Sequence, residues 1–157
     1  LVMSEPHLKM TEFHWLMDIL QTIDVGLVVL DRGYNIKLWN GFMENHSGLR
    51  PDQAKEKCLF DLFKEIDEDW FKKKAEPVFL LNTRAFTISE QRPYLFKFSN
   101  NNPITGRAPH MYQNATMIPL NNSDGATDHL CLIIYDVTHN AVNKQQLKTI
   151  ESLLHSG

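Results

Sequence analysis

Hydrophobic residues recur along the chain with two different periods, which divides it into helical and extended segments. The first helix is predicted between Thr11 and Asp24, where apolar residues recur at the three- and four-residue spacing of an amphipathic helix. Two short apolar runs follow, residues 27–31 and 36–39. The turn residues 32–35 between them predict an antiparallel hairpin.

The middle of the chain is predominantly helical. Asn40 can cap a short helix that Gly48 ends, and further short helices are predicted up to residue 63. A longer helix starts at Asp67, where an acidic side chain complements the helix dipole. Pro77 lies inside that helix, so we expect a kink or a break there.

From Arg84 the period changes to two. A strand over residues 84–98 would place several large apolar side chains on one face, with Pro93 making it an edge or bulged strand. The members of that predicted face are Phe86, Ile88, Tyr94, Phe96 and Phe98. A polar loop follows over residues 99–109, and then a strand over Met111–Leu120.

The last strand is predicted over His129–Val137. Its run of six consecutive apolar residues, 130–135, indicates burial on both faces and therefore a central place in the sheet. A polar helix follows from Asn140, with a narrow stripe of Leu147, Ile150 and Leu154 that suits a seam between two paired helices. The order of the elements predicts an α+β layer, an antiparallel sheet with helices over one face.

Composition narrows the possible functions. The 157 residues carry a net charge of -3, which argues against a nucleic-acid partner. Two cysteines are too few for a disulfide scaffold, no apolar run is long enough for membrane insertion, and residues 1–10 show no signal peptide. We therefore expect a soluble, cytoplasmic protein, and the ends of the sequence suggest a segment of a longer chain.

Four motifs in this order resemble a PAS domain, the sensory-box family. They are Gly26–Asp31, Leu38-Trp39-Asn40, Gly48-Leu49 and Tyr135-Asp136-Val137-Thr138. The resemblance implies a five-stranded antiparallel sheet in strand order 2-1-5-4-3, with helices cupping one face and flanking helices at both ends. It divides the chain into an N-terminal flanking segment (1–23), a PAS core (24–138) and a C-terminal signalling helix (139–157).

The same resemblance implies a sensory and regulatory role rather than catalysis. The segment Leu59–Phe63 is most similar to PAS domains attached to GGDEF diguanylate cyclase modules, although the chain has no GGDEF segment of its own. The implied partners are a second copy of the chain in a homodimer, a small-molecule ligand and a covalently linked effector domain of a bacterial signalling protein.

Two residues at the end of the last strand are candidates for signal relay. The resemblance implies that Asp136 and Thr138 connect the sheet to the outgoing helix. A strand that ends in Asp-x-Thr just before a helix supplies both a hydrogen-bond acceptor and a capping residue, which can make such a connection. The alternative interpretation is that these residues simply cap the helix.

Candidate ligand-binding residues lie on the two preceding predicted strands. Glu90 and Arg92 share parity with the aromatic residues, Phe96 among them, unless Pro93 marks a bulge that turns both charges to water. Tyr112, Asn114 and Thr116 share parity on the next strand, where they either face a ligand or form a solvated outer face.

The sequence names no cofactor. Cys58 lacks the neighbours that flavin-binding PAS domains show, and no histidine lies in the long helix where haem-binding members carry one, so flavin and haem are disfavoured. No metal-binding motif or catalytic arrangement is present. Two alternatives stay open: a ligand-free dimerisation module whose cup is filled by side chains, and a small cone-shaped α+β enzyme using Glu90.

Overall fold

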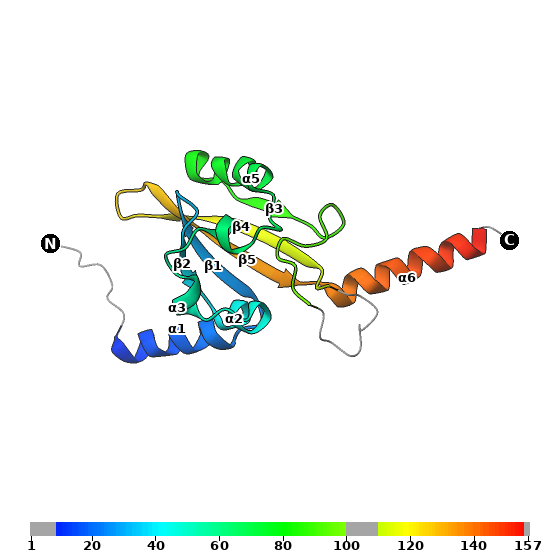
Figure 1. Cartoon of the computed structure of the whole chain (residues 1–157), viewed down its shortest axis with the longest axis horizontal. Coiled ribbons are helices and arrows are strands. Elements are labelled where there is room, and N and C mark those ends of the chain that lie inside the picture. Colours follow the sequence, from blue (N-terminus) through cyan, green and yellow to red (C-terminus); the bar gives the residue numbers. More distant parts are fainter. Residues whose placement is uncertain (1–8, 100–109, 156–157) are drawn as a thin grey trace.

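The computed structural model describes residues 9–99 and 110–155 of the chain (Figure 1). The helices are α1 (Met10–Thr22), α2 (Gly41–Ser47), α3 (Pro51–Ala54), α4 (Leu59–Leu62), α5 (Glu68–Leu81) and α6 (Thr138–His155). The strands are β1 (Gly26–Asp31), β2 (Ile36–Trp39), β3 (Ala85–Thr87), β4 (Gln113–Asn121) and β5 (Thr127–Asp136).

The strands form one antiparallel sheet in the order β2-β1-β5-β4-β3. The α+β class, the strand order and the central position of the last strand are therefore confirmed. In the register of β5, Leu132 lies opposite Val28 of β1 on one side and Met117 of β4 on the other. The last strand therefore pairs with both halves of the sheet and leads directly into α6.

The two faces of the central strand differ in burial. Leu130, Leu132 and Ile134 are fully buried on the face that the helices cover, whereas Cys131 and Ile133 are only half-buried. Burial of this strand on both faces was therefore a wrong expectation. An antiparallel sheet commonly buries only one face, and the apolar residues of the other face remain partly open here.

The helices divide into those that cover the sheet and those that flank it. The long helix α5 packs on β3, β4 and β5, while α2 and α3 pack beside β1 and β2. We call the space between these helices and the sheet the interior. The helix α6 projects away from the body of the domain, and α1 lies along its other end (Figure 1).

Asn40 fixes the start of α2, as predicted. Its side chain is 1% exposed, and its Oδ1 accepts hydrogen bonds from the N–H groups of Met43 (3.4 Å) and Leu27 (3.0 Å). Its amide also donates to the carbonyl of Val25 at 2.8 Å. This one side chain therefore joins α2 to the first strand.

The long helix continues through Pro77 to Leu81, so the break expected there does not occur. Proline removes one backbone donor, but Val78 and Phe79 beside it are buried. Their tertiary packing keeps the last turn helical despite the missing hydrogen bond.

The strand expected over residues 84–98 is much shorter than predicted, because β3 ends at Thr87. The N–H groups of Gln91 and Arg92 both donate to the carbonyl of Ile88, which closes a turn before Pro93. This turn breaks the parity across the segment. Phe86 is 59% exposed while Phe96 is fully buried, so the single aromatic face was a wrong expectation.

Candidate functional site

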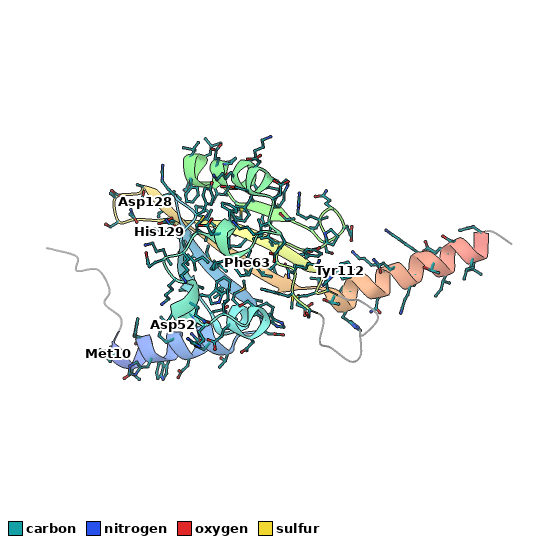
Figure 2. The ribbon with its side chains drawn as sticks, in the orientation of Figure 1. Met10, Asp52, Phe63, Tyr112, Asp128 and His129 are labelled. Atoms are coloured by element: carbon teal, nitrogen blue, oxygen red, sulfur yellow. The ribbon has the colours of Figure 1, made fainter. Side chains whose placement is uncertain are left out.

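The interior is filled by aromatic side chains in mutual contact. The ring of Phe96 meets the ring of Phe63 edge-on at 4.9 Å between centroids and that of Trp39 at 6.3 Å. Phe98 stacks on Phe96 at 5.3 Å, and Phe63 lies at the centre of the domain in Figure 2. Of the predicted ligand-binding residues, Phe96 therefore lies within the packed core.

The polar side chain that does face the interior is Gln113, which sequence reasoning missed. It is 2% exposed, and its Oε1 accepts hydrogen bonds from the backbone N–H groups of Leu95 and Phe96, both at 3.0 Å. Its amide donates to the carbonyl of Phe96 at 2.8 Å. The signal was available in the sequence, since Gln113 shares parity with Met111 and Met117.

The other three predicted residues of β4 and its start lie on the opposite face of the sheet. Tyr112, Asn114 and Thr116 are half-buried and point away from the interior. The Asn114 Oδ1 accepts a hydrogen bond from the N–H of Ser89 at 2.9 Å, and the Tyr112 hydroxyl accepts one from Gln145 of α6 at 3.2 Å. Tyr112 and Asn114 thus attach this face to neighbouring segments.

Glu90 and Arg92 both lie in the turn that follows β3, and their side chains contact different helices. Glu90 is exposed and forms an ion pair with Lys144 of α6. The hydrogen bond from Lys144, together with its charge, holds the pKa of Glu90 below its usual value. The Arg92 guanidinium lies over the ring of Trp70, 3.9 Å from its centroid, and is directed to α5 instead.

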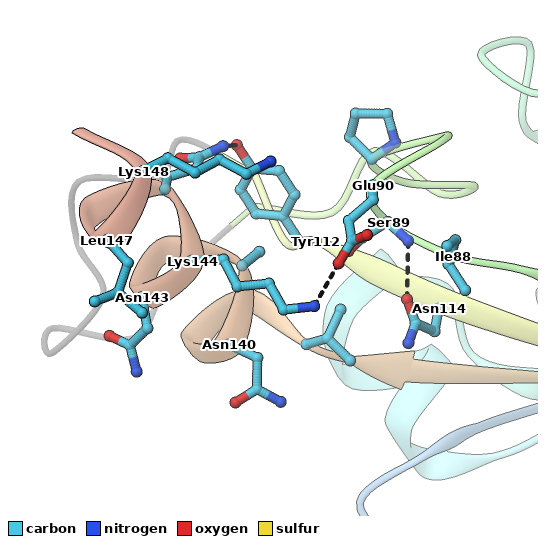
Figure 3. A pocket seen from close by; sticks show the side chains of 14 residues that line it. Ile88, Ser89, Glu90, Tyr112, Asn114, Asn140, Asn143, Lys144, Leu147 and Lys148 are labelled. Carbon is cyan, nitrogen blue, oxygen red and sulfur yellow. Dashed lines mark hydrogen bonds and ion pairs between the residues drawn. The ribbon is translucent and has the colours of Figure 1, made fainter. Parts of the chain in front are cut away.

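Glu90, Tyr112 and Asn114 come together in one pocket of about 750 Å³ between α6 and the outer face of the sheet (Figure 3). We call this the outer pocket. Its walls are the turn 88–93, the start of β4 and the first three turns of α6. Arg92, Phe96 and Thr116 do not line it. Three of the six predicted ligand-binding residues therefore line one pocket, although that pocket lies outside the interior.

The two predicted relay residues form a hydrogen-bonded junction beneath this pocket. The Asp136 Oδ1 accepts hydrogen bonds from the Thr138 N–H at 3.0 Å and from its hydroxyl at 2.6 Å. The Thr138 Oγ1 accepts in turn from the N–H of Tyr112 at 3.0 Å, and the Val137 N–H donates to the Tyr112 carbonyl at 2.9 Å. We call these four residues the junction.

The junction is well shielded and joins three elements. Thr138 is only 3% exposed, because it lies where β5 ends and α6 begins, beside the residue that precedes β4. Removing a buried hydroxyl that both donates and accepts a hydrogen bond lowers the free energy of unfolding by about 1–3 kcal/mol. The helix therefore leaves the sheet in a direction that Asp136 and Tyr112 fix together.

The described part of the chain contains neither a candidate metal site nor, at Cys131, a thiol activated for reaction. Within residues 9–99 and 110–155, no cluster of three or more His, Cys, Asp or Glu side chains could hold a metal ion. Burial raises the pKa of the Cys131 thiol to about 11, which keeps it protonated at neutral pH. No helix in those residues has the length and apolarity that crossing a membrane requires.

Comparison with known proteins gives the fold. No family model matches the chain, and no curated protein sequence does either. A sensory box sensor histidine kinase from Vibrio cholerae is 26% identical over 81% of this chain and 93% of that one, with a TM-score of 0.58. The chain has the PAS fold.

Two further structures support this at lower identity. A PAS domain of a protein from Colwellia psychrerythraea is 12% identical over 81% of this chain and 98% of that one, with a TM-score of 0.60. An RNA-binding Light-Oxygen-Voltage receptor is 15% identical over 99% of this chain and 42% of that one, with a TM-score of 0.64. At such identities the likeness concerns the PAS fold alone.

Proposed function

We propose that this chain is a sensory and regulatory PAS domain that controls an effector domain of the same polypeptide through α6. The observation that carries the proposal is the junction, in which the buried Thr138 hydroxyl joins Asp136 of β5 to the backbone of Tyr112. Any displacement of β4 against β5 must change these hydrogen bonds. The first turn of α6 would therefore move together with the ends of these two strands.

The mechanism is a shift between two populations of the helix. In one state the junction and the Glu90–Lys144 ion pair hold the first turns of α6 against the domain. In the other state these contacts are broken and the helix takes a different direction. A signal acts by binding one state better than the other, and it shifts the equilibrium only by that difference in affinity.

The proposed partner is a second copy of the chain, held through the flanking helices. Leu147, Ile150 and Leu154 are 59%, 52% and 76% exposed and recur at the spacing of a helix-pairing seam. The helix α1 has no buried residue and presents Trp15 at 60% and Ile19 at 54% exposure. Pairing would cover these side chains, and a change in the direction of α6 would reach the partner.

The output proposed from the sequence resemblance is a GGDEF diguanylate cyclase. A histidine kinase is the second candidate, since the structure at 26% identity belongs to a sensor histidine kinase. The two outputs are distinguished by assaying the full-length protein for synthesis of cyclic di-GMP from GTP and for autophosphorylation by ATP.

The two alternatives to a sensor can be weighed against the geometry. The packed rings of Trp39, Phe63 and Phe96 favour an interior without ligand, as a pure dimerisation module would have. Such a module does not require a hydrogen-bonded junction at the exit of α6. The enzyme alternative rests on Glu90, which is exposed and ion-paired rather than buried with a raised pKa.

Two substitutions at one residue test the proposal. In the full-length protein, Thr138→Val keeps the shape of the side chain but removes both hydrogen bonds of its hydroxyl, whereas Thr138→Ser keeps the hydroxyl. We expect Thr138→Val to make the output insensitive to the signal, and Thr138→Ser to stay regulated. Unaltered regulation in a folded Thr138→Val protein would contradict the proposal.

A further inference from the structure

The outer pocket has no role in holding the fold together or in the hydrogen bonds of the junction. Its volume of about 750 Å³ lies within the range of pockets that hold small molecules, whereas rings fill the interior. We propose that the outer pocket binds a small organic monocarboxylate. The acid group would bind at the lysines of α6, and an apolar body would lie against the walls.

The charges in the pocket favour a single negative charge on the ligand. Lys144 is already paired with Glu90 (Figure 3). Lys148, one turn further along α6, makes no ion pair with any residue in 9–99 or 110–155, although its charge contributes to lowering the pKa of Glu90. Two lysines and one carboxylate leave one positive charge, which a monoanion neutralises.

The neutral polar groups of the pocket can donate hydrogen bonds to a ligand. The Asn114 Oδ1 is occupied by the Ser89 N–H, which leaves the Asn114 amide N–H groups without a partner among the described residues. The Asn140 side chain likewise makes no hydrogen bond within the part of the chain that the structure describes. A carbonyl or hydroxyl oxygen on the ligand would satisfy such donors.

The rest of the wall is apolar and comes from both sides. Ile88 and Pro93 contribute from the turn after β3, and Val137, Ala141 and Leu147 contribute from the start of α6 and its preceding residue. An inorganic anion would leave these side chains in contact with water. A flat or branched hydrocarbon body covers them and gains the favourable free energy of apolar burial.

Binding there would bridge α6 and the sheet. A ligand held by Lys148 on the helix and Asn114 on β4 stabilises the attached state of α6, because it contacts both elements only when they are close. This regulatory consequence rests on the proposed function. The binding itself does not depend on it.

The test is a titration of the full chain, followed by amide ¹H–¹⁵N NMR. The probe is 4-hydroxyphenylacetate, which carries a carboxylate, a flat apolar ring and a hydroxyl. Its matched controls are the neutral 4-hydroxyphenylacetamide, the cationic tyramine and inorganic phosphate. We expect saturable shifts at Ser89, Asn114 and Lys148 with the acid, and binding about tenfold weaker with the neutral amide.

A pair of lysine substitutions supplies the control in the protein. Lys148→Met keeps the aliphatic stem but removes the charge, and should weaken binding of the acid about tenfold. Lys73→Met, on the exposed side of α5, should leave it unchanged. The proposal is overturned by the absence of saturable shifts with the acid, by equal binding of phosphate or tyramine, or by an unaffected Lys148→Met. Shifts confined to interior residues such as Trp39 would overturn it equally.

The experiments distinguish an error in the proposed ligand site from an error in the proposed relay function. If the acid binds but Thr138→Val stays fully regulated, the outer pocket is a ligand site and the proposed function is wrong. If no acid binds while Thr138→Val loses regulation, the relay stands and the ligand site is wrong.

Discussion

Gln113 should be one of the most sensitive positions in the domain. Its buried side chain makes three hydrogen bonds to the backbone of Leu95 and Phe96, a segment that belongs to no helix or strand. Gln113→Leu would leave the two buried N–H groups of Leu95 and Phe96 without partners, whereas the Phe96 carbonyl keeps the N–H of Phe98 at 2.8 Å. At about 1–3 kcal/mol for each of these two unsatisfied groups, partly offset by the added apolar contact, we expect a loss of about 2–4 kcal/mol in the free energy of unfolding.

That loss is measurable by two independent methods. Urea unfolding followed by tryptophan fluorescence should show a lower midpoint with an unchanged slope. The melting temperature should fall by about 6–12 °C for a chain of this length. The matched control is Thr116→Val, on the outer face of the same strand, where the side chain makes no hydrogen bond among the described residues. Its effect should stay within about 0.5 kcal/mol.

If Gln113→Leu is destabilised no more than Thr116→Val, the reasoning is refuted. The hydrogen bonds of Gln113 would then contribute nothing to holding residues 95–96 in the interior. A selective loss in Gln113→Leu, with Thr116→Val unaffected, would instead assign the order of this irregular segment to one side chain.

Three further predictions concern other positions. Asn40→Ala should lower the free energy of unfolding by about 2–3 kcal/mol in urea titrations, because it removes the cap of α2 and two bonds to the chain around β1. With a pKa of about 11, Cys131 should resist iodoacetamide at pH 8 in a Cys58→Ser protein and react only as the pH approaches 11, as mass spectrometry would detect. The pKa of Glu90 lies below its usual 4.5, so its ion pair with Lys144 should persist at pH 5–8 and be lost as the pH falls through that lowered pKa; amide shifts at Lys144 report this.

The sequence predicted the order and type of most elements, for physical reasons that can be named. The central place of the last strand was predicted correctly from its continuous apolar run, although only one of its two faces is fully buried. Both ends of α2 were recognisable. Asn40 is a strong capping residue for its start, and Gly48 can take the left-handed conformation, with φ of 78°, that ends the helix. These are local signals, and the structure keeps them.

The segment after β3 could not be predicted, because its conformation depends on contacts distant in sequence. Phe86 and Phe96 share parity, yet the turn at residues 88–92 places the first in solvent and the second in the interior. The interior position of Phe96 depends on Gln113, which lies 17 residues further along the chain. No period along the sequence contains that information.

The candidate site was predicted in part for the same reason. Parity correctly grouped Tyr112, Asn114 and Thr116, but it could not say which face of the sheet the helices cover. The outer pocket also needs the path of α6, which brings Lys144 and Lys148 beside residues 88–93. A helix that leaves the domain gives no sequence signal for its direction.

The central claim is that the junction sets the direction of α6, and the distance between two spin labels tests it most directly. We would attach the labels at the exposed positions Lys55, which follows α3, and Glu151 on α6, in a chain whose Cys58 and Cys131 are replaced by serine. Dilution with unlabelled chain restricts the pulsed electron-paramagnetic-resonance measurement to distances within one molecule.

In the attached state of α6, in which the junction is intact, we expect one narrow distance distribution, which Thr138→Ser preserves. Thr138→Val should broaden or shift that distribution while the circular dichroism of the domain stays that of the folded chain. An unchanged distribution in Thr138→Val, or one already broad with Thr138 in place, would contradict the account.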